Sequence, residues 1–214
     1  GLDRVYSTLE RWPELEEILS NDIRILELDG DEQASTVESL YWRIADLYEY
    51  RLNQPERAVE VFQHLNQMRP EELGPTLRLE TLYQALSQHE ELLDIYLLQD
   101  SLLEGNDQLE VQRKMGRLLT NELARPFEAI DLWRKILEAV ENDQEALNSL
   151  ESLYESVEEW RDLISVCEQQ LELSSGHTEQ EIKYLSKLGQ IWGDRLERPQ
   201  SAISTWQKVV ALAP

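Results

Sequence analysis

Small, apolar and aromatic positions recur at fixed distances around three prolines of the sequence. The segments around Pro55, Pro126 and Pro199 can be superposed in register. At matched offsets lie Ala45, Gly116 and Gly189 upstream, Ala58, Ala129 and Ala202 downstream, and further downstream Phe62, Trp133 and Trp206. Proline is well tolerated in the first turn of a helix, so each of these prolines is predicted to begin a helix.

A second frame alternates with the first along the chain and starts at a tyrosine. Its shared positions are Tyr6, Tyr83 and Tyr154, then Leu9, Leu86 and Val157, then Trp12, His89 and Trp160, then Leu15, Leu92 and Leu163. Each copy of either frame is long enough for two short helices joined by a corner. Two types of helical hairpin are therefore predicted to alternate, about six hairpins in all.

Each hairpin is predicted to carry an apolar face that its own two helices cannot bury, so stacked copies are required. The small residue of the first helix is expected to let the alanine of the second helix come close. The aromatic residue one turn later is expected to fill the space between successive hairpins. Abundant Leu, Glu, Gln and Ala, with almost no alternating run of Val, Ile and Thr, favour an all-α fold.

This pattern resembles the tetratricopeptide repeat, in which a small residue on the first helix is followed by an alanine, an aromatic residue and a proline on the second. The corresponding set in the second hairpin is Tyr41, Ile44, Ala45, Tyr48, Ala58, Phe62 and Pro70. Successive small-residue positions, 45, 80, 116, 151 and 189, lie 35, 36, 35 and 38 residues apart, near the repeat length of about 34 in that family. The resemblance implies a right-handed α-solenoid that forms a single domain over residues 1–214.

Some positions depart from the family pattern. Glu80 and Glu151 occupy the small position in alternate hairpins, which are therefore expected to pack less closely. An additional residue before each repeated proline is similar to the half-a-tetratricopeptide repeats of RNA-processing scaffolds, and this leaves a second kinship open. The last predicted helix has no polar cover, so the chain is expected to be a segment of a longer protein or to self-associate through an uncapped end.

The charge of the chain narrows its expected partners. Acidic residues outnumber basic ones by 43 to 20, and the net charge is −23. Phosphate backbones are repelled by such a charge, so no nucleic acid is expected as a partner. No stretch is apolar enough for a membrane span, and the N-terminus lacks the regions of a signal peptide. Cys167 is the only cysteine, which excludes an internal disulfide, and a cytoplasmic location is predicted.

The sequence contains no phosphate-binding glycine loop, nucleophile elbow or zinc-protease motif. His89 aligns with two tryptophans and is expected to pack under a hairpin rather than bind metal. Cys167 aligns with Leu19 and Tyr96 and is expected to be a small buried hydrophobe rather than a nucleophile. No cofactor or metal is predicted, and the chain is not expected to be an enzyme.

In the family that the chain resembles, particular positions of each first helix line a concave groove. Transferring them to this sequence selects thirty residues with seven bases and six acids, a sum of +1, whereas the other 184 residues hold 13 bases and 37 acids, or −24. The resemblance thus implies a nearly neutral groove with a basic centre. Its candidate contact residues are Arg113, Lys114 and Arg117 in the centre, with Arg78, Lys187 and Trp42 beside them. Alternatively, acids accumulate outside the groove only for solubility.

These observations predict a non-catalytic scaffold for protein–protein interaction, which holds a partner protein or an acidic peptide in the groove by charge-assisted hydrogen bonds. A regulatory segment of a larger enzyme or signalling protein, acting through its uncapped ends, is the alternative. A scaffold for RNA processing is a third possibility, which the acidity of the chain disfavours.

Overall fold

The computed structural model describes residues 2–28 and 33–212, and all regular structure in these ranges is helical. The chain divides into two compact units at Glu104, and each unit is described by itself. Unit 1 contains α1 (Leu2–Thr8), α2 (Trp12–Leu28), α3 (Ala34–Tyr50), α4 (Pro55–Met68), α5 (Leu73–Leu86) and α6 (His89–Leu102). Unit 2 contains α7 (Gly105–Asn121), α8 (Pro126–Ala139), α9 (Gln144–Ser156), α10 (Trp160–Leu173), α11 (Thr178–Gln190), the π-helical turn η2 (Ile191–Arg195) and α12 (Pro199–Leu212). The single domain expected for residues 1–214 stays a prediction.

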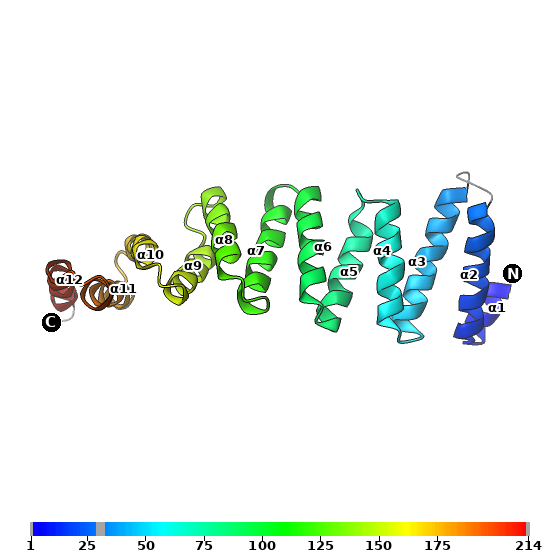
Figure 1. Cartoon of the computed structure of the whole chain (residues 1–214), viewed down its shortest axis with the longest axis horizontal. Coiled ribbons are helices and arrows are strands. Elements are labelled where there is room, and N and C mark those ends of the chain that lie inside the picture. The colour runs from blue at the N-terminus through cyan, green and yellow to red at the C-terminus, as the bar shows by residue number, and fades with distance from the viewer. Residues whose placement is uncertain (1, 29–32, 213–214) are drawn as a thin grey trace. The chain divides into compact units, whose positions relative to one another are not determined.

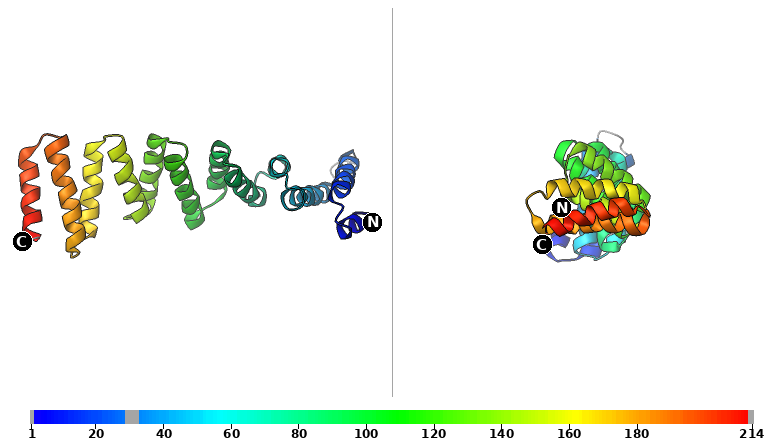
Figure 2. Two further views of the ribbon diagram at one scale, coloured as in Figure 1. Left: turned by 90° about the horizontal axis from the view of Figure 1, so that it is seen from below. Right: turned by 90° about the vertical axis from the view of Figure 1, so that its left-hand side faces the viewer.

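Within each unit, consecutive helices pair as hairpins and the hairpins stack in chain order. In unit 1 the pairs are α1–α2, α3–α4 and α5–α6, and α2 and α4 also pack on α3 and α5 (Figure 1). In unit 2 the pairs are α7–α8, α9–α10 and α11–α12, and α8 and α10 also pack on α9 and α11 (Figure 2, left). The second helices α2, α4, α8 and α10 therefore each contribute to two neighbouring interfaces.

The predicted helix starts are confirmed. Pro55, Pro126 and Pro199 are the first residues of α4, α8 and α12. In the other frame, α2, α6 and α10 begin at the aligned positions Trp12, His89 and Trp160. The described residues thus form the expected all-α array of six hairpins of two alternating types, which is the architecture of an α-solenoid.

The additional residue before each repeated proline reverses the chain. Asn53, Ala124 and Glu197 lie two residues before these prolines and have left-handed backbones, with φ of 52°, 50° and 52°. The next residue then donates its N–H to a carbonyl of the preceding helix, as in the 2.9 Å bond from Arg125 to Leu119. A left-handed backbone costs a residue with a β-carbon about 1 kcal/mol, so these corners are maintained by the packing of the helices they join.

The small residue of the first helix has a different partner from the one expected. In the hairpin α7–α8, a β-carbon added to Gly116 would lie 2.5 Å from Cε2 of Trp133, and the nearest atoms all belong to that indole. In α11–α12, Gly189 faces Trp206 in the same way, while the β-carbon of Ala202 lies opposite Gly193. The aromatic residue, which was expected to fill the space between successive hairpins, therefore also packs on the small residue of its own hairpin. Gly116 and Gly189 admit an indole ring within their own hairpins.

The alternate hairpins replace this close contact by a buried hydrogen bond. In α5–α6, Nε2 of Gln99 donates to the carboxylate of Glu80 at 3.1 Å. In α9–α10, Nε2 of Gln170 donates to Glu151 at 2.9 Å. Both glutamines are at most 2% exposed, so a donor from the second helix meets a carboxylate at the position where the other hairpins carry a small residue.

Gly116→Ala is expected to destabilise unit 2 by roughly 1–3 kcal/mol, because the new methyl group would overlap an indole that is 1% exposed and cannot move aside. Gly189→Ala is the matched control. It introduces a similar overlap with Trp206, but that ring is 38% exposed and can shift, so the cost should be clearly smaller. Urea unfolding of both variants measures the difference, and equal losses would contradict the assigned role of Trp133.

Candidate functional site

Charged side chains join the first helices of neighbouring hairpins in unit 2, beginning with α7 and α9. Arg117 donates from Nε and Nη2 to the two carboxylate oxygens of Glu145, at 2.5 and 2.7 Å. Arg113 donates to Asp143 at 2.7 Å and also pairs with Glu110. The Arg113–Asp143 pair is largely shielded from water, with side chains 17% and 8% exposed, whereas the Arg117–Glu145 pair is open to solvent.

A second connection joins α11 to α9 and α10. Nζ of Lys187 donates to Glu151 and Glu155, both at 2.7 Å. Glu151 also accepts from Gln170, whose carbonyl oxygen accepts the hydroxyl of Tyr184. Burial alone would lower the pKa of Lys187, but the two carboxylates outweigh it and raise that pKa, so the ammonium group stays charged. This network holds the fifth and sixth hairpins together.

In unit 1, Arg78 of α5 performs the corresponding role toward α3. It donates to Glu49 at 2.7 Å and to Asp46 at 3.1 Å. Its guanidinium carbon also lies 5.2 Å from the ring centroid of Tyr50 and 5.5 Å from that of Phe62. Arg78 is thus anchored by ion pairs to α3 and by cation–π contacts to aromatic rings of α3 and α4.

Trp42, the aromatic residue expected to contact a partner, is half-buried on α3. Its ring meets Phe62 of α4 edge-on, with centroids 5.4 Å apart. A β-carbon added to Gly74 at the start of α5 would lie 3.2 Å from this indole. Much of the ring therefore packs between hairpins, and only its remaining surface is available to a ligand.

The basic centre expected at Arg113, Lys114 and Arg117 is therefore compensated within the protein. Both arginines are paired with carboxylates, and Lys114, half-buried on α7, also has an interaction partner. Sequence reasoning missed Asp143, which lies before α9 and outside the transferred groove positions. We refer to the charged surface of α7, α9 and α11 formed by Arg113, Arg117, Glu145, Lys183 and Lys187 as the first-helix face of unit 2.

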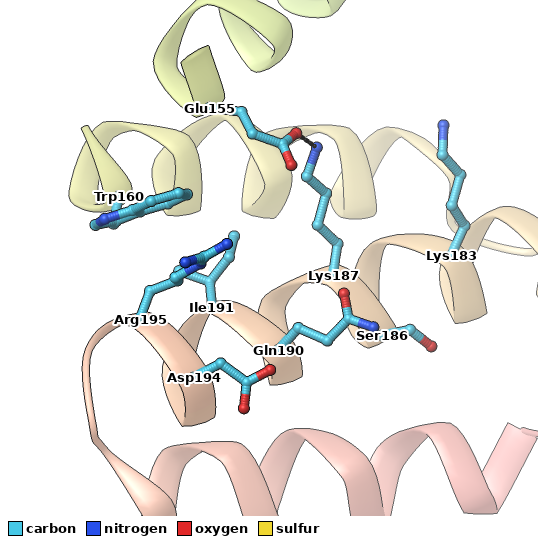
Figure 3. Close-up of a pocket in the computed structure, with 9 residues that line it drawn as sticks. All are labelled: Glu155, Trp160, Lys183, Ser186, Lys187, Gln190, Ile191, Asp194 and Arg195. Atoms are coloured by element: carbon cyan, nitrogen blue, oxygen red, sulfur yellow. Dashed lines mark hydrogen bonds and ion pairs between the residues drawn. The ribbon is translucent and has the colours of Figure 1, made fainter. Parts of the chain in front are cut away.

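A pocket of about 510 Å³ opens on the first-helix face of unit 2 (Figure 3). It is lined by Glu155, Trp160, Lys183, Ser186, Lys187, Gln190, Ile191, Asp194 and Arg195. Six of these nine residues occupy transferred groove positions, and the exceptions are Trp160, Ile191 and Arg195. We call this cavity the unit 2 pocket. It lies where the resemblance placed the groove.

One wall of the unit 2 pocket is a stacked pair that sequence reasoning did not find. The guanidinium carbon of Arg195, at the end of η2, lies 4.9 Å from the ring centroid of Trp160, the first residue of α10. Figure 3 shows Arg195 beneath the indole, with the Lys187–Glu155 ion pair beside them. Lys183 extends past this ion pair and is exposed. Within residues 2–28 and 33–212 it forms no ion pair, and its Nζ lies 4.9 Å from the ring centroid of Tyr184, so an anionic ligand would compete only with this exposed cation–π contact.

Unit 1 contains a pocket at the equivalent place in the repeat. It measures about 380 Å³ and includes Trp12, Arg43, Asp46 and Arg51 in its lining. Arg51 lies 5.0 Å from the ring centroid of Trp12, which reproduces the Arg195–Trp160 stack. Arg43, a basic residue in the lining of this unit 1 pocket, is already paired with Asp3. The unit 2 pocket is therefore the better candidate for an anionic ligand.

The remaining candidates from the sequence lie elsewhere. Cys167 is fully buried, as predicted, and burial together with the nearby carboxylate of Glu151 raises the pKa of its thiol to about 12. His89 is the first residue of α6, and its Nδ1 is shielded from solvent. The described residues hold no group of three His, Cys, Asp or Glu side chains arranged for a metal ion. No helix in the described ranges combines the length and apolarity needed to cross a membrane.

The chain resembles known proteins in one segment of sequence and in its fold. Residues 146–181, from α9 into α11, match the family model of the tetratricopeptide repeat. A crystal structure of MamA is 15% identical over 82% of this chain and 91% of its own, with a TM-score of 0.50. YrrB, described as a TPR protein with an unusual peptide-binding site, is 17% identical over 81% of this chain and 84% of its own, with a TM-score of 0.49. Residues 41 to the end of MamA from Desulfovibrio magneticus RS-1 are 18% identical over 82% of this chain and 94% of that one, with a TM-score of 0.47. No curated protein matches the chain.

Replacing Asp143 separates its two roles, because its side chain also accepts the N–H of Ala146 at 2.8 Å and caps α9. Asparagine keeps the cap and removes the charge, whereas alanine removes both. At pH 7 we expect Asp143→Ala to be less stable than Asp143→Asn by about 1 kcal/mol, the usual value of a cap. Urea unfolding measures this difference, and identical stabilities would exclude the cap.

The charged role of Asp143 predicts a dependence on pH. Burial raises the pKa of this carboxyl, but the N–H of Ala146 and the guanidinium of Arg113 lower it more, so the pKa lies below its ordinary value. The stabilisation is therefore present above the ordinary pKa of about 4 and is lost as the pH falls through the lower folded value. The advantage of the native chain over Asp143→Asn should shrink between pH 7 and pH 3 in the same unfolding measurement. An advantage independent of pH would contradict the ion pair.

Proposed function

We propose that this chain, of which residues 146–181 match the tetratricopeptide repeat, is a non-catalytic scaffold that binds a partner protein on the first-helix face of unit 2. The observation that carries the proposal is the unit 2 pocket, a cavity of about 510 Å³ rimmed by Lys183 and Lys187 in a chain of net charge −23. The lining holds three basic residues, Lys183, Lys187 and Arg195, and two acidic ones, Glu155 and Asp194, so the pocket is slightly positive in a strongly acidic molecule, which favours a ligand of negative charge.

The lining of the pocket favours a peptide over a small molecule. Small-molecule sites are mostly apolar and enclose their ligand. Here Lys183, Gln190, Asp194 and Arg195 are exposed and polar, and the apolar contribution comes from Ile191 and part of an indole. An extended segment lying across the surface can place one carboxylate at the lysine and an apolar side chain against the indole.

The acidic peptide is proposed to continue from the pocket toward α7, where Arg113, Lys114 and Arg117 are the candidate contacts. Among the two arginines, Arg117 is the more accessible, because its pair with Glu145 is exposed and a peptide carboxylate can replace that glutamate. Arg113 is paired with Asp143 and largely shielded from solvent, so its main role is to join α7 to the corner before α9. Exchange of one carboxylate for another gains little free energy, so binding through these arginines should be weak and reversible.

Arg78 and Trp42 of unit 1 are proposed as additional contacts for a longer partner. Arg78 is held by Asp46 and Glu49, and 31% of its side chain is exposed. The alternative function, a regulatory segment that acts through its ends, is favoured by one observation. Helix α12 exposes Ile203, Trp206 and Val210 to solvent.

A labelled decaglutamate peptide tests the proposal by fluorescence anisotropy at about 0.15 M salt, where long-range repulsion from the acidic surface is screened beyond about 8 Å. Arg117→Gln/Lys183→Gln removes one exchangeable and one unpaired cation, and each pair should contribute up to about 1 kcal/mol. We expect the double variant to bind about tenfold more weakly. Thermal melting of the variant shows whether the fold is kept.

The matched control is Arg134→Gln/Lys135→Gln, which makes the same change in charge at exposed positions of the second helix α8. It should leave binding of decaglutamate unchanged. Decalysine serves as the opposite probe. If decalysine binds and decaglutamate does not, the acidic surface rather than the first-helix face is the binding region, and the proposal is wrong.

A further inference from the structure

Helix α12 carries a stripe of exposed apolar side chains along one face. Ile203 is 58% exposed, Trp206 38% and Val210 67%, and their spacing of three and four residues places them on the same side of the helix. The indole of Trp206 covers Gly189 of α11, so one side of the ring is packed within the hairpin. The stripe lies apart from the unit 2 pocket, whose lining includes no residue of α12.

Two of these three positions are buried in the two other hairpins of this type, whereas Leu137 and Asn66, the counterparts of Val210, are half-buried. In α8, Ile130 and Trp133 stand at the same distances from the helix-starting proline as Ile203 and Trp206, and they are 6% and 1% exposed. The side chains are identical and only the covering element differs, because α9 packs on α8. In α4, the equivalent Val59 and Phe62 are likewise buried, and α5 packs on that helix.

We propose that the exposed stripe of α12 is a docking surface for a helical hairpin of the α9–α10 kind. The first helix of such a hairpin presents Ala146, Leu147 and Leu150, which are at most 1% exposed in α9. The occupant is defined by this chemistry: a helix with a small residue followed by leucines one and four positions later, backed by a second helix. It docks on α12 as α9 packs on α8, in which Ile130 and Trp133 are buried.

The chain itself carries a hairpin of the same frame, α1–α2, with an uncovered apolar position but without counterparts of Ala146 and Leu147. Val5 of α1 is aligned with Leu82 of α5 and Leu153 of α9. Val5 is 49% exposed, whereas each of the two leucines is 4% exposed. However, α1 spans seven residues against thirteen in α9, so it offers a smaller face. A second copy of the chain is therefore a weak occupant of the surface, distinguishable by the dependence of docking on concentration.

The test appends the hairpin to the full chain. Residue 214 aligns with Glu141, so a copy of residues 142–175 placed directly after it keeps the α8–α9 register. Ile203→Cys reports coverage of the stripe by its rate of thiol labelling, because the native Cys167 is buried and does not compete. Cysteine 167 of the appended copy is replaced by alanine. Ser204→Cys is the matched control, since its counterpart Asp131 is exposed in α8.

We expect labelling at Ile203→Cys to slow at least about tenfold in the extended chain, because reaction then requires local opening, and labelling at Ser204→Cys to stay unchanged. A second extended chain, whose appended copy carries Leu147→Asp and Leu150→Asp, should lose the protection. Protection that is absent from the first extended chain, or kept in the second, would overturn the proposal. The readout does not involve decaglutamate, so its failure is separate from failure of the proposed function.

The 214-residue chain provides the second measurement. If Ile203→Cys becomes protected as the protein concentration rises and Val5→Asp removes this protection, a second copy docks through α1–α2, which lacks counterparts of Ala146 and Leu147, and the proposed chemistry of the occupant is then wrong. Labelling that does not depend on concentration excludes a second copy as the occupant. Protection that persists with Val5→Asp means that two copies meet through α12 itself, and the hairpin is then the wrong occupant. Sedimentation velocity at the same concentrations confirms which species is present.

Discussion

Every hairpin in this chain has an apolar face that its own two helices cannot cover. The second helix of one hairpin therefore packs on the first helix of the next, as α4 packs on α5 and α8 on α9. The core is consequently distributed along each unit, with side chains such as Phe62 and Trp133 buried at successive interfaces. Because each hairpin contacts only its neighbours, stability is expected to be a sum of local terms, and an uncovered face is felt most strongly at the last helix of a stack.

The two hairpin types differ in how their two helices meet at the small-residue position, and the candidate site depends on this difference. A small residue such as Gly116 lets an indole come close, whereas Glu151 meets a glutamine by a hydrogen bond. The second oxygen of the Glu151 carboxylate then accepts a hydrogen bond from the next hairpin, because Nζ of Lys187 donates to it at 2.7 Å. The same ion pair that joins two hairpins thus holds the lysine at the rim of the unit 2 pocket. Structure and candidate function share these groups, so substitution of Lys187 would confound the two.

Much of the architecture was predictable because it depends on local sequence signals that recur in each copy of the repeat. Prolines at Pro55, Pro126 and Pro199 start helices for a backbone reason that needs no tertiary information. Charge pairing was not predictable in this way, because a bond such as Arg113–Asp143 joins a helix to a corner and depends on how two hairpins are rotated. The Arg195–Trp160 stack lies between these cases. A pairing signal was present, since arginine and tryptophan recur together at the equivalent positions of both pockets, but Trp12 and Trp160 were interpreted only as structural residues of the repeat.

The two proposed surfaces differ in the physics of binding, and this decides how each responds to conditions. On the first-helix face, a peptide carboxylate competes with Glu145 for Arg117, so the gain is a difference between similar ion pairs and falls as salt screens the contact. On α12, docking removes Ile203 and Trp206 from water, a gain proportional to apolar area and nearly independent of salt. Salt should therefore release an acidic peptide while a docked hairpin stays in place.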